Sequence, residues 1–147
     1  MIDGSASLMT LFFGVKAAGF WTSRWGENLL DTGVHFYNVY ETADRKYISI
    51  GPIEPKFFAE LLCLLGLKAE HLTYQMDKKS WPEMHEYFQT VFKTKTRDEW
   101  CSILEGTDAY LAPVLFMDEA LNYPHNKMRG IFIDIDGLVQ PSQALHS

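Results

Sequence analysis

The sequence predicts one α+β domain with a few-stranded antiparallel sheet and several helices. A helix-like segment comes first, two strand-like segments follow near residue 40, and a third strand-like segment lies near residue 133. Helix-like segments occupy most of the rest, and strands and helices do not alternate as in a doubly wound sheet. With 147 residues, 47% of them hydrophobic, the chain is long and apolar enough to form one core.

The first third of the chain predicts a helix and a hairpin. Residues 5–21 are rich in Leu, Phe and Met, which predicts a helix that is apolar on more than one face. A polar, glycine-containing connection covers residues 23–33. Residues 34–42 and 46–51 are strand-like, and the short link between them predicts an antiparallel hairpin.

Two helices are predicted in the middle of the chain by their end signals. Pro55 stands at the first helical position of one, and Gly66 follows its last turn. Ser80 with Glu83 has the spacing of a capping box and predicts that the next helix starts at residue 81.

The last third predicts shorter elements. Thr96 with Glu99 forms another capping-box pattern, which starts a helix that ends at Gly106. Residues 107–115 read as an extended link and residues 117–123 as a short helix. Residues 131–137 alternate apolar and polar side chains, which predicts a third strand.

Charge and cysteine usage limit the class of protein. The net charge is −6 and no Lys/Arg run occurs, so neither nucleic acid nor an anionic membrane is a predicted partner. Cys63 and Cys101 lie in apolar helical patterns, which predicts reduced, buried thiols. The N-terminal segment has neither the pattern of a signal peptide nor that of a membrane span. We therefore expect an intracellular protein, cytoplasmic by default, with a peroxisome or mitochondrion open if the source is eukaryotic.

No motif for a metal or cofactor is present, and the five histidines have no ligand spacing, so we expect no metal site and no cofactor. Among the acids, Glu54 is placed unusually, between a strand that ends at Gly51 and a helix that starts at Pro55. Glutamate is a poor helix cap. It either gains a modest interaction with the helix dipole or is exposed there as an acid/base group.

Other polar clusters allow both a structural and a binding role. Arg24, Asn28 and Asp31 in the polar connection could contact a ligand or satisfy backbone groups of the loop. Asp108 could be a turn residue. The segment "PHNKMRG" (124–130) could hold an anion or form a solvated loop.

Four longer stretches resemble family III CoA-transferases, and within that family its racemase branch. They are "GENLLDTGVHFYNVYETAD", "YISIGPIEPKFF", "WCSILEGTDAYLAPVL" and "PHNKMRG", in unbroken order over nearly the whole chain. The resemblance implies that residues 1–147 form the small domain of the family, with residues 1–21 as a connecting helix. The large Rossmann-like CoA-binding domain is absent, so we expect the isolated chain to be inactive.

The resemblance also implies a reaction and roles for individual residues. The racemases invert the 2-methyl centre of acyl-CoA thioesters through an enolate, with coenzyme A thioester as substrate and no separate cofactor. Glu54 matches the acid that partners the catalytic histidine, and Arg24, Asn28, His35 and Tyr37 are the expected substrate-binding residues. The intact enzyme is expected to be an interlocked homodimer. CoA transfer between carboxylic acids and a non-catalytic self-association fragment stay open as alternatives.

Four departures from the racemase pattern stand out. Thr32 replaces the first glycine of a Gly-Gly pair, and "ADRK" (43–46) replaces an Asp-Gly turn. Tyr110 stands at the usual cysteine. His35 stands at the usual proline and is the departure expected to alter the edge of the pocket.

Overall fold

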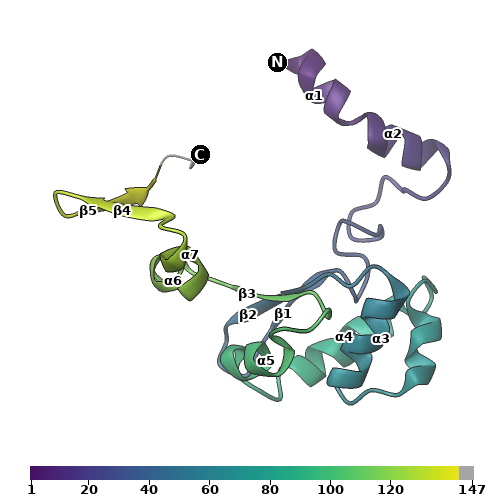
Figure 1. The fold of residues 1–147 in the computed structure, drawn as a ribbon. Helices are drawn as coiled ribbons and strands as arrows, with labels where there is room; N and C mark the ends of the chain where they lie inside the picture. Colours follow the sequence, from purple (N-terminus) through teal and green to yellow (C-terminus); the bar gives the residue numbers. More distant parts are fainter. Residues whose placement is uncertain (143–147) are drawn as a thin grey trace. The chain divides into compact units, whose positions relative to one another are not determined.

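The computed structural model describes residues 1–142 (Figure 1). The chain divides into two compact units, residues 1–113 and residue 114 onward. Helices and small antiparallel sheets make up both, in agreement with the predicted α+β class.

The sheet of the first unit is built on the predicted hairpin. Strands β1 (Asn38–Glu41) and β2 (Tyr47–Ile50) pair antiparallel, with Val39 opposite Ser49. Strand β3 (Leu111–Val114) lies on the other side of β2, so the sheet order is β1-β2-β3. The expected link over residues 107–115 therefore contains a strand. The strand contains a proline, which argues against a strand in a sequence pattern. Proline is tolerated here because β3 lies at the edge of the sheet.

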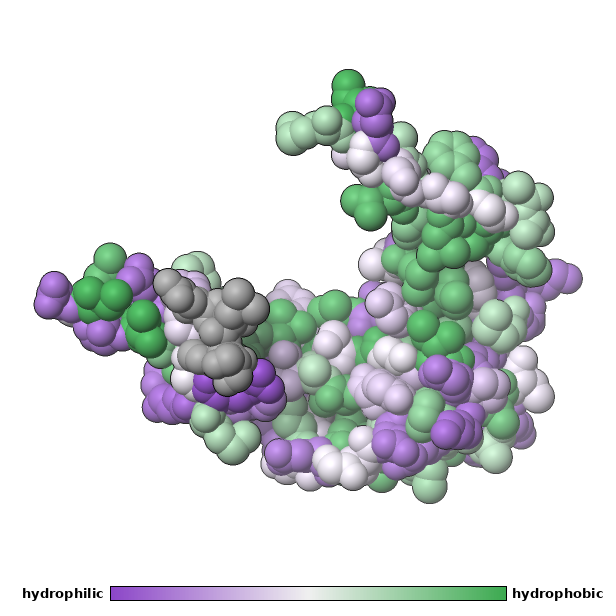
Figure 2. Space-filling model, turned by 45° about the horizontal axis from the view of Figure 1, so that its top comes forward, coloured by the Kyte–Doolittle hydropathy of each residue, from purple (hydrophilic) through white to green (hydrophobic). Residues whose placement is uncertain are grey.

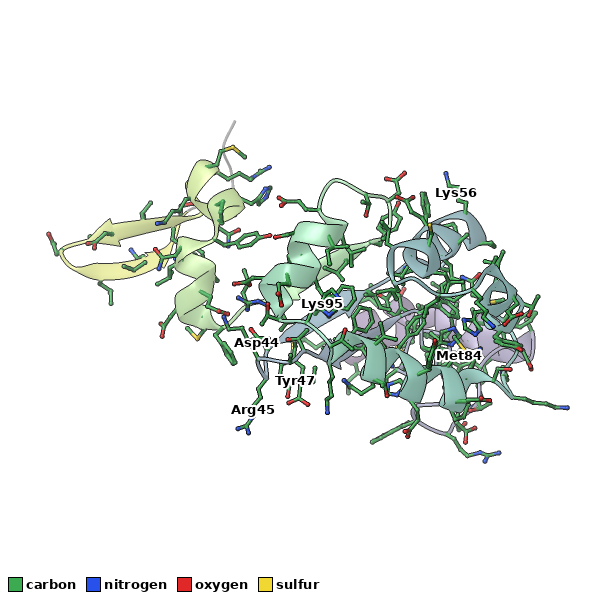
Figure 3. The ribbon with its side chains drawn as sticks, turned by 90° about the horizontal axis from the view of Figure 1, so that it is seen from below. Asp44, Arg45, Tyr47, Lys56, Met84 and Lys95 are labelled. Carbon is green, nitrogen blue, oxygen red and sulfur yellow. The ribbon has the colours of Figure 1, made fainter. Side chains whose placement is uncertain are left out.

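The turn between β1 and β2 uses a strained residue. Arg45 has a φ of 60° where the racemase pattern has glycine, and its side chain points away from the chain into solvent (Figure 3). The Asp44 carboxylate accepts hydrogen bonds from the Thr42 hydroxyl (2.6 Å) and from the Arg97 N–H (3.1 Å). These bonds join the turn to the start of helix α5 (Arg97–Leu104).

Helices α3 (Pro55–Leu64), α4 (Trp81–Phe92) and α5 (Arg97–Leu104) match the predicted positions, and a 3₁₀ helix, η1 (Ala69–Tyr74), precedes α4. The capping box at Thr96 is confirmed. The one at Ser80 was wrong: its hydroxyl donates to the Asp77 carboxylate (2.8 Å) and makes no bond to the helix N-terminus.

Both cysteines were predicted to be buried. This was wrong for Cys63, which is exposed, and Cys101 is half-buried. The buried residues of α3 are Phe58, Leu61 and Leu62. Position 63 falls outside the stripe that these residues define, because consecutive helical residues turn by about 100°.

The core of the first unit is a cluster of aromatic rings between β1 and helices α3 and α4. Its largest fully buried side chains are Phe36, Tyr40, Phe58, Phe88 and Phe92. Their ring centroids lie 5.1–6.3 Å apart in the tilted and edge-to-face arrangements that aromatic pairs prefer.

The N-terminal segment was predicted as one helix and forms two, α1 (Ile2–Leu8) and α2 (Thr10–Ala17). The Thr10 hydroxyl donates to the Ser7 carbonyl (2.7 Å), the kind of local bond that bends helices. Neither helix has a buried residue, and Figure 2 shows apolar side chains along this segment. Within residues 1–142, no helix has the length and hydropathy to cross a bilayer.

The second unit contains helices α6 (Met117–Asn122) and α7 (Pro124–Met128) and a separate hairpin. The predicted strand is confirmed as β4 (Phe132–Ile135), but its partner β5 (Leu138–Pro141) was missed. The two turn residues, Asp136 and Gly137, both have positive φ. Asp-Gly is a strong hairpin signal and could have revealed β5.

Candidate active site at the end of strand β2

Glu54 lies in a short turn that joins β2 to α3. The Gly51 N–H donates to the Tyr110 carbonyl (3.0 Å), and the Ile53 N–H turns back to the Gly51 carbonyl (2.9 Å). Glu54 is in extended conformation (φ −73°, ψ 137°), and Pro55 starts the helix. The backbone on both sides of Glu54 is therefore tightly constrained.

The carboxylate of Glu54 does not cap α3. Its side chain is exposed and accepts no hydrogen bond from the helix N-terminus. The Glu54 backbone carbonyl accepts the Phe57 and Phe58 N–H groups instead (3.1 and 3.0 Å). The carboxylate is therefore not a hydrogen-bonded cap, and the two roles considered for it, a helix-dipole interaction and an acid/base group, both stay predictions.

A groove of about 620 Å³ runs over the sheet, and Gly51 forms part of its wall. Tyr110, another wall residue, packs edge-on against Phe57 in the first turn of α3, with ring centroids 4.8 Å apart. The groove is therefore next to the turn that carries Glu54. We call it the sheet groove; its lining residues are Leu30, Thr32, Tyr37, Asn38, Val39, Ser49, Ile50, Gly51, Tyr110, Leu111 and Ala112.

Tyr37 is the expected substrate-binding residue that lies in this groove. It is 40% exposed. Two carbons of its ring lie 3.6 Å from the position of a Cβ on Gly51, an ordinary van der Waals distance, so the ring lies against the turn before Glu54. The structure brings Tyr37 into the same region as Glu54, which its position in the sequence alone did not require.

Asn28 lies instead at the centre of a closed loop. Its side chain is 1% exposed, accepts the Thr22 N–H (2.7 Å) and donates to the Arg24 carbonyl (3.1 Å) and to the Asp31 carboxylate (2.5 Å). Burial opposes ionisation of Asp31, but the bonds from Asn28 and the loop backbone outweigh it and hold the pKa of this carboxyl below its usual range. The polar groups of Asn28 are occupied within the protein.

His35 and Arg24 occupy opposite environments. His35 is fully buried, and neither ring nitrogen has a hydrogen-bond partner within residues 1–142. A ligand on the surface cannot contact it without opening the core. Arg24 is largely exposed and pairs with Glu27 (3.2 Å).

In the basic segment 124–130, residues 124–128 form α7 and Arg129 is its C-cap; His125, Lys127 and Arg129 are all exposed. No group of three or more His, Cys, Asp or Glu side chains in the part of the chain that the structure describes is arranged to hold a metal ion.

Thr32 adopts a φ of 73°, the left-handed region that disfavours β-branched residues. We expect Thr32→Gly to stabilise the chain by about 1 kcal/mol, because glycine relieves this strain at an exposed position. Urea unfolding should show a higher midpoint with an unchanged slope. Thr32→Ala retains a Cβ and is the matched control: an equal gain in that variant would show that the strain is not the cause.

The chain is similar to known proteins over nearly its whole length. The model of CoA-transferase family III matches residues 1–146. Alpha-methylacyl-CoA racemase of Mus musculus is 45% identical over 142 residues, which are 97% of this chain and 37% of the mouse protein. Alpha-methylacyl-CoA racemase of Homo sapiens is 43% identical over 133 residues, 90% of this chain and 35% of the human protein. The chain thus spans little more than a third of the length of these relatives.

A solved structure shows the same fold at low sequence identity. Rv3272 from Mycobacterium tuberculosis superposes with a TM-score of 0.70 at 15% identity, over 99% of this chain and 38% of that protein. The match of the family model over almost every residue establishes the family: the chain belongs to CoA-transferase family III.

Proposed function

We propose that the chain forms part of an enzyme that inverts the 2-methyl centre of acyl-CoA thioesters. The observation that carries this proposal is Glu54, an exposed carboxylate that does not cap its helix and is held at a constrained strand-to-helix turn. The names of the mouse and human relatives support the choice of reaction.

The proposed chemistry is proton transfer at the carbon next to the thioester carbonyl. One base removes the proton, the enolate forms, and an acid returns a proton to the opposite face. Glu54 is proposed to orient a histidine from outside this chain and to stabilise its protonated form. The coenzyme A thioester is the substrate, and the reaction requires no electron transfer.

The sheet groove is the proposed boundary of the substrate site within this chain. Tyr37 is retained as a substrate contact because it lines the groove next to Gly51. Arg24 is retained as an exposed cation. Asn28 and His35 are assigned structural roles instead, because the hydrogen bonds of Asn28 are internal and His35 is fully buried.

CoA transfer between carboxylic acids is the second candidate, because the matched family is described as one of CoA-transferases. A racemase exchanges the proton at the 2-position with solvent, whereas transfer requires an acceptor acid and leaves that proton in place.

Proton exchange in D₂O distinguishes these functions. We expect the 147-residue chain alone to exchange no deuterium into 2-methylacyl-CoA. A chimaera of the mouse relative that carries this chain over the 142 matched positions should do so. A folded chimaera that transfers CoA to an acceptor acid without exchange at the 2-position would overturn the racemase proposal.

We further propose that the chain self-associates, as part of a homodimer in the intact enzyme. Helices α1 and α2 bury no residue, and Ile2, Leu8 and Phe13 are 67–85% exposed. Apolar surface of this kind is uncommon on monomers. Light scattering at micromolar concentration should detect dimers or larger species; a monomer that binds no hydrophobic dye would contradict this.

A further inference from the structure

The turn that carries Glu54 is held by a side chain from a distant part of the sequence. Gln75 follows η1 and is only 3% exposed. Its amide nitrogen donates to the Pro52 carbonyl (3.2 Å) and to the Ile53 carbonyl (2.8 Å). These are the two carbonyls directly before Glu54 in the chain.

The Pro52 and Ile53 carbonyls need a side-chain donor because they lie outside the hydrogen-bonded ladder of the sheet. Strand β2 ends at Ile50, so residues 52 and 53 lie beyond its ladder of backbone pairs. Pro52 is buried. A buried carbonyl without a donor costs about 1–3 kcal/mol. Gln75 supplies two N–H groups from one nitrogen, which an apolar side chain of the same size could not do.

Gln75 is itself fixed by the start of α4. The indole N–H of Trp81, a residue that is 6% exposed, donates to the Gln75 carbonyl (2.9 Å). Between them, the Asp77 carboxylate accepts the Lys79 N–H (3.1 Å) and the Ser80 hydroxyl (2.8 Å). A continuous series of hydrogen bonds therefore runs from α4 through Gln75 to the turn before Glu54.

We propose that Gln75 is a positioning residue that sets the direction of the Glu54 carboxylate, with Trp81 as its support. The proposal rests on the function proposed above for Glu54. Gln75 is buried and bonded to the turn, so its proposed action is to restrict the backbone from which the carboxylate projects. Precise placement of this kind is what acid/base groups require, since displacements of about 1 Å can cost about a hundredfold in rate.

The first test measures the turn itself in the 147-residue chain. Gln75→Met keeps the side-chain volume and removes the donor, and Trp81→Phe removes the indole N–H. Amide hydrogen exchange at Ile53 and Phe57 should become roughly tenfold faster in both variants, because local opening needs fewer broken bonds.

Trp100→Phe is the matched control. Trp100 is 3% exposed, and its indole N–H also donates to a backbone carbonyl, that of Phe92 (2.9 Å). It should lower global stability by a similar amount and leave the ratio of turn to core exchange unchanged. Equal exchange ratios in all three variants would overturn the proposal, and Trp81→Phe decides the matter if Gln75→Met does not fold.

The second test asks whether Gln75 acts through Glu54. In the chimaera, Gln75→Met should lower kcat roughly tenfold and change KM by less than about twofold. In a Glu54→Gln background it should have little further effect, because the group that it positions is already absent. Independent, multiplicative losses would overturn the positioning role.

The two proposals fail separately. If Glu54→Gln leaves the chimaera fully active, the function proposed for Glu54 is wrong, and hydrogen exchange alone then decides whether Gln75 holds the turn. If exchange at the turn does not respond to Gln75→Met or Trp81→Phe, the positioning role is wrong while the function of Glu54 is unaffected.

Discussion

Glu54→Gln should lower kcat of the chimaera by at least about tenfold, because an acid/base contribution is typically worth roughly 10²–10⁴-fold in rate. The melting temperature should be nearly unchanged. The substitution keeps the shape of the side chain and removes its charge, and no hydrogen bond to the helix is lost because the Glu54 side chain makes none. Steady-state kinetics with 2-methylacyl-CoA and thermal unfolding provide the two measurements.

Glu83→Gln is the appropriate control for this substitution. Glu83 is an exposed acid in the first turn of α4, so it experiences a helix dipole as Glu54 does. Loss of its charge should cost at most about 1 kcal/mol of stability and leave kcat unchanged. A Glu54→Gln variant that turns over normally and is less stable, as Glu83→Gln is expected to be, would reduce Glu54 to a dipole-stabilising residue.

His35 should make the chain lose about 3 kcal/mol of stability in weak acid. Its ring is fully buried and packs against Phe36, Phe58 and Phe88, with centroids 5.1–5.4 Å apart. Burial, together with the nearby charge of His85, lowers the pKa of His35 from 6.5 to about 4. The titratable groups next to this cluster are Tyr40 on β1 and His85 on α4, whose rings contact each other.

The direction follows from proton uptake. Between pH 6.5 and about 4, the unfolded chain protonates this imidazole while the folded chain keeps it neutral. The contribution of His35 is therefore fully present above pH 6.5, is lost as the pH falls through this window, and changes no further below pH 4. Urea unfolding at a series of pH values measures the loss directly.

His35→Leu should remove most of this acid dependence. It should also raise stability at pH 7 by about 1 kcal/mol, because two unpaired ring nitrogens leave the core. His125→Leu introduces the same change at an exposed position and should retain the acid dependence. If His35→Leu loses stability at pH 7 and still weakens in acid, His35 must have a partner and the burial argument is wrong.

The sequence alone determined the elements whose signals are local. The hairpin of β1 and β2, the start of α3 at Pro55 and the capping box at Thr96 are each encoded within a few residues. Such signals act through backbone φ, hydrogen bonds between neighbours and the period of apolar side chains, so they can be recognised without the rest of the chain. The family resemblance was also visible in the sequence and is confirmed by the match to the family model.

Only the tertiary structure decided what each polar residue near the site does. Gln75 lies 22 residues from Ile53 in sequence and donates to its carbonyl, and no local pattern marks that bond. His35 and Tyr37 are near neighbours in the chain, yet one is sealed among phenylalanines and the other lines the sheet groove. The physical reason is that burial and long-range hydrogen bonds depend on which segments meet in space. The path of the whole chain determines which segments become neighbours, and the residue types in those segments only make the contacts favourable.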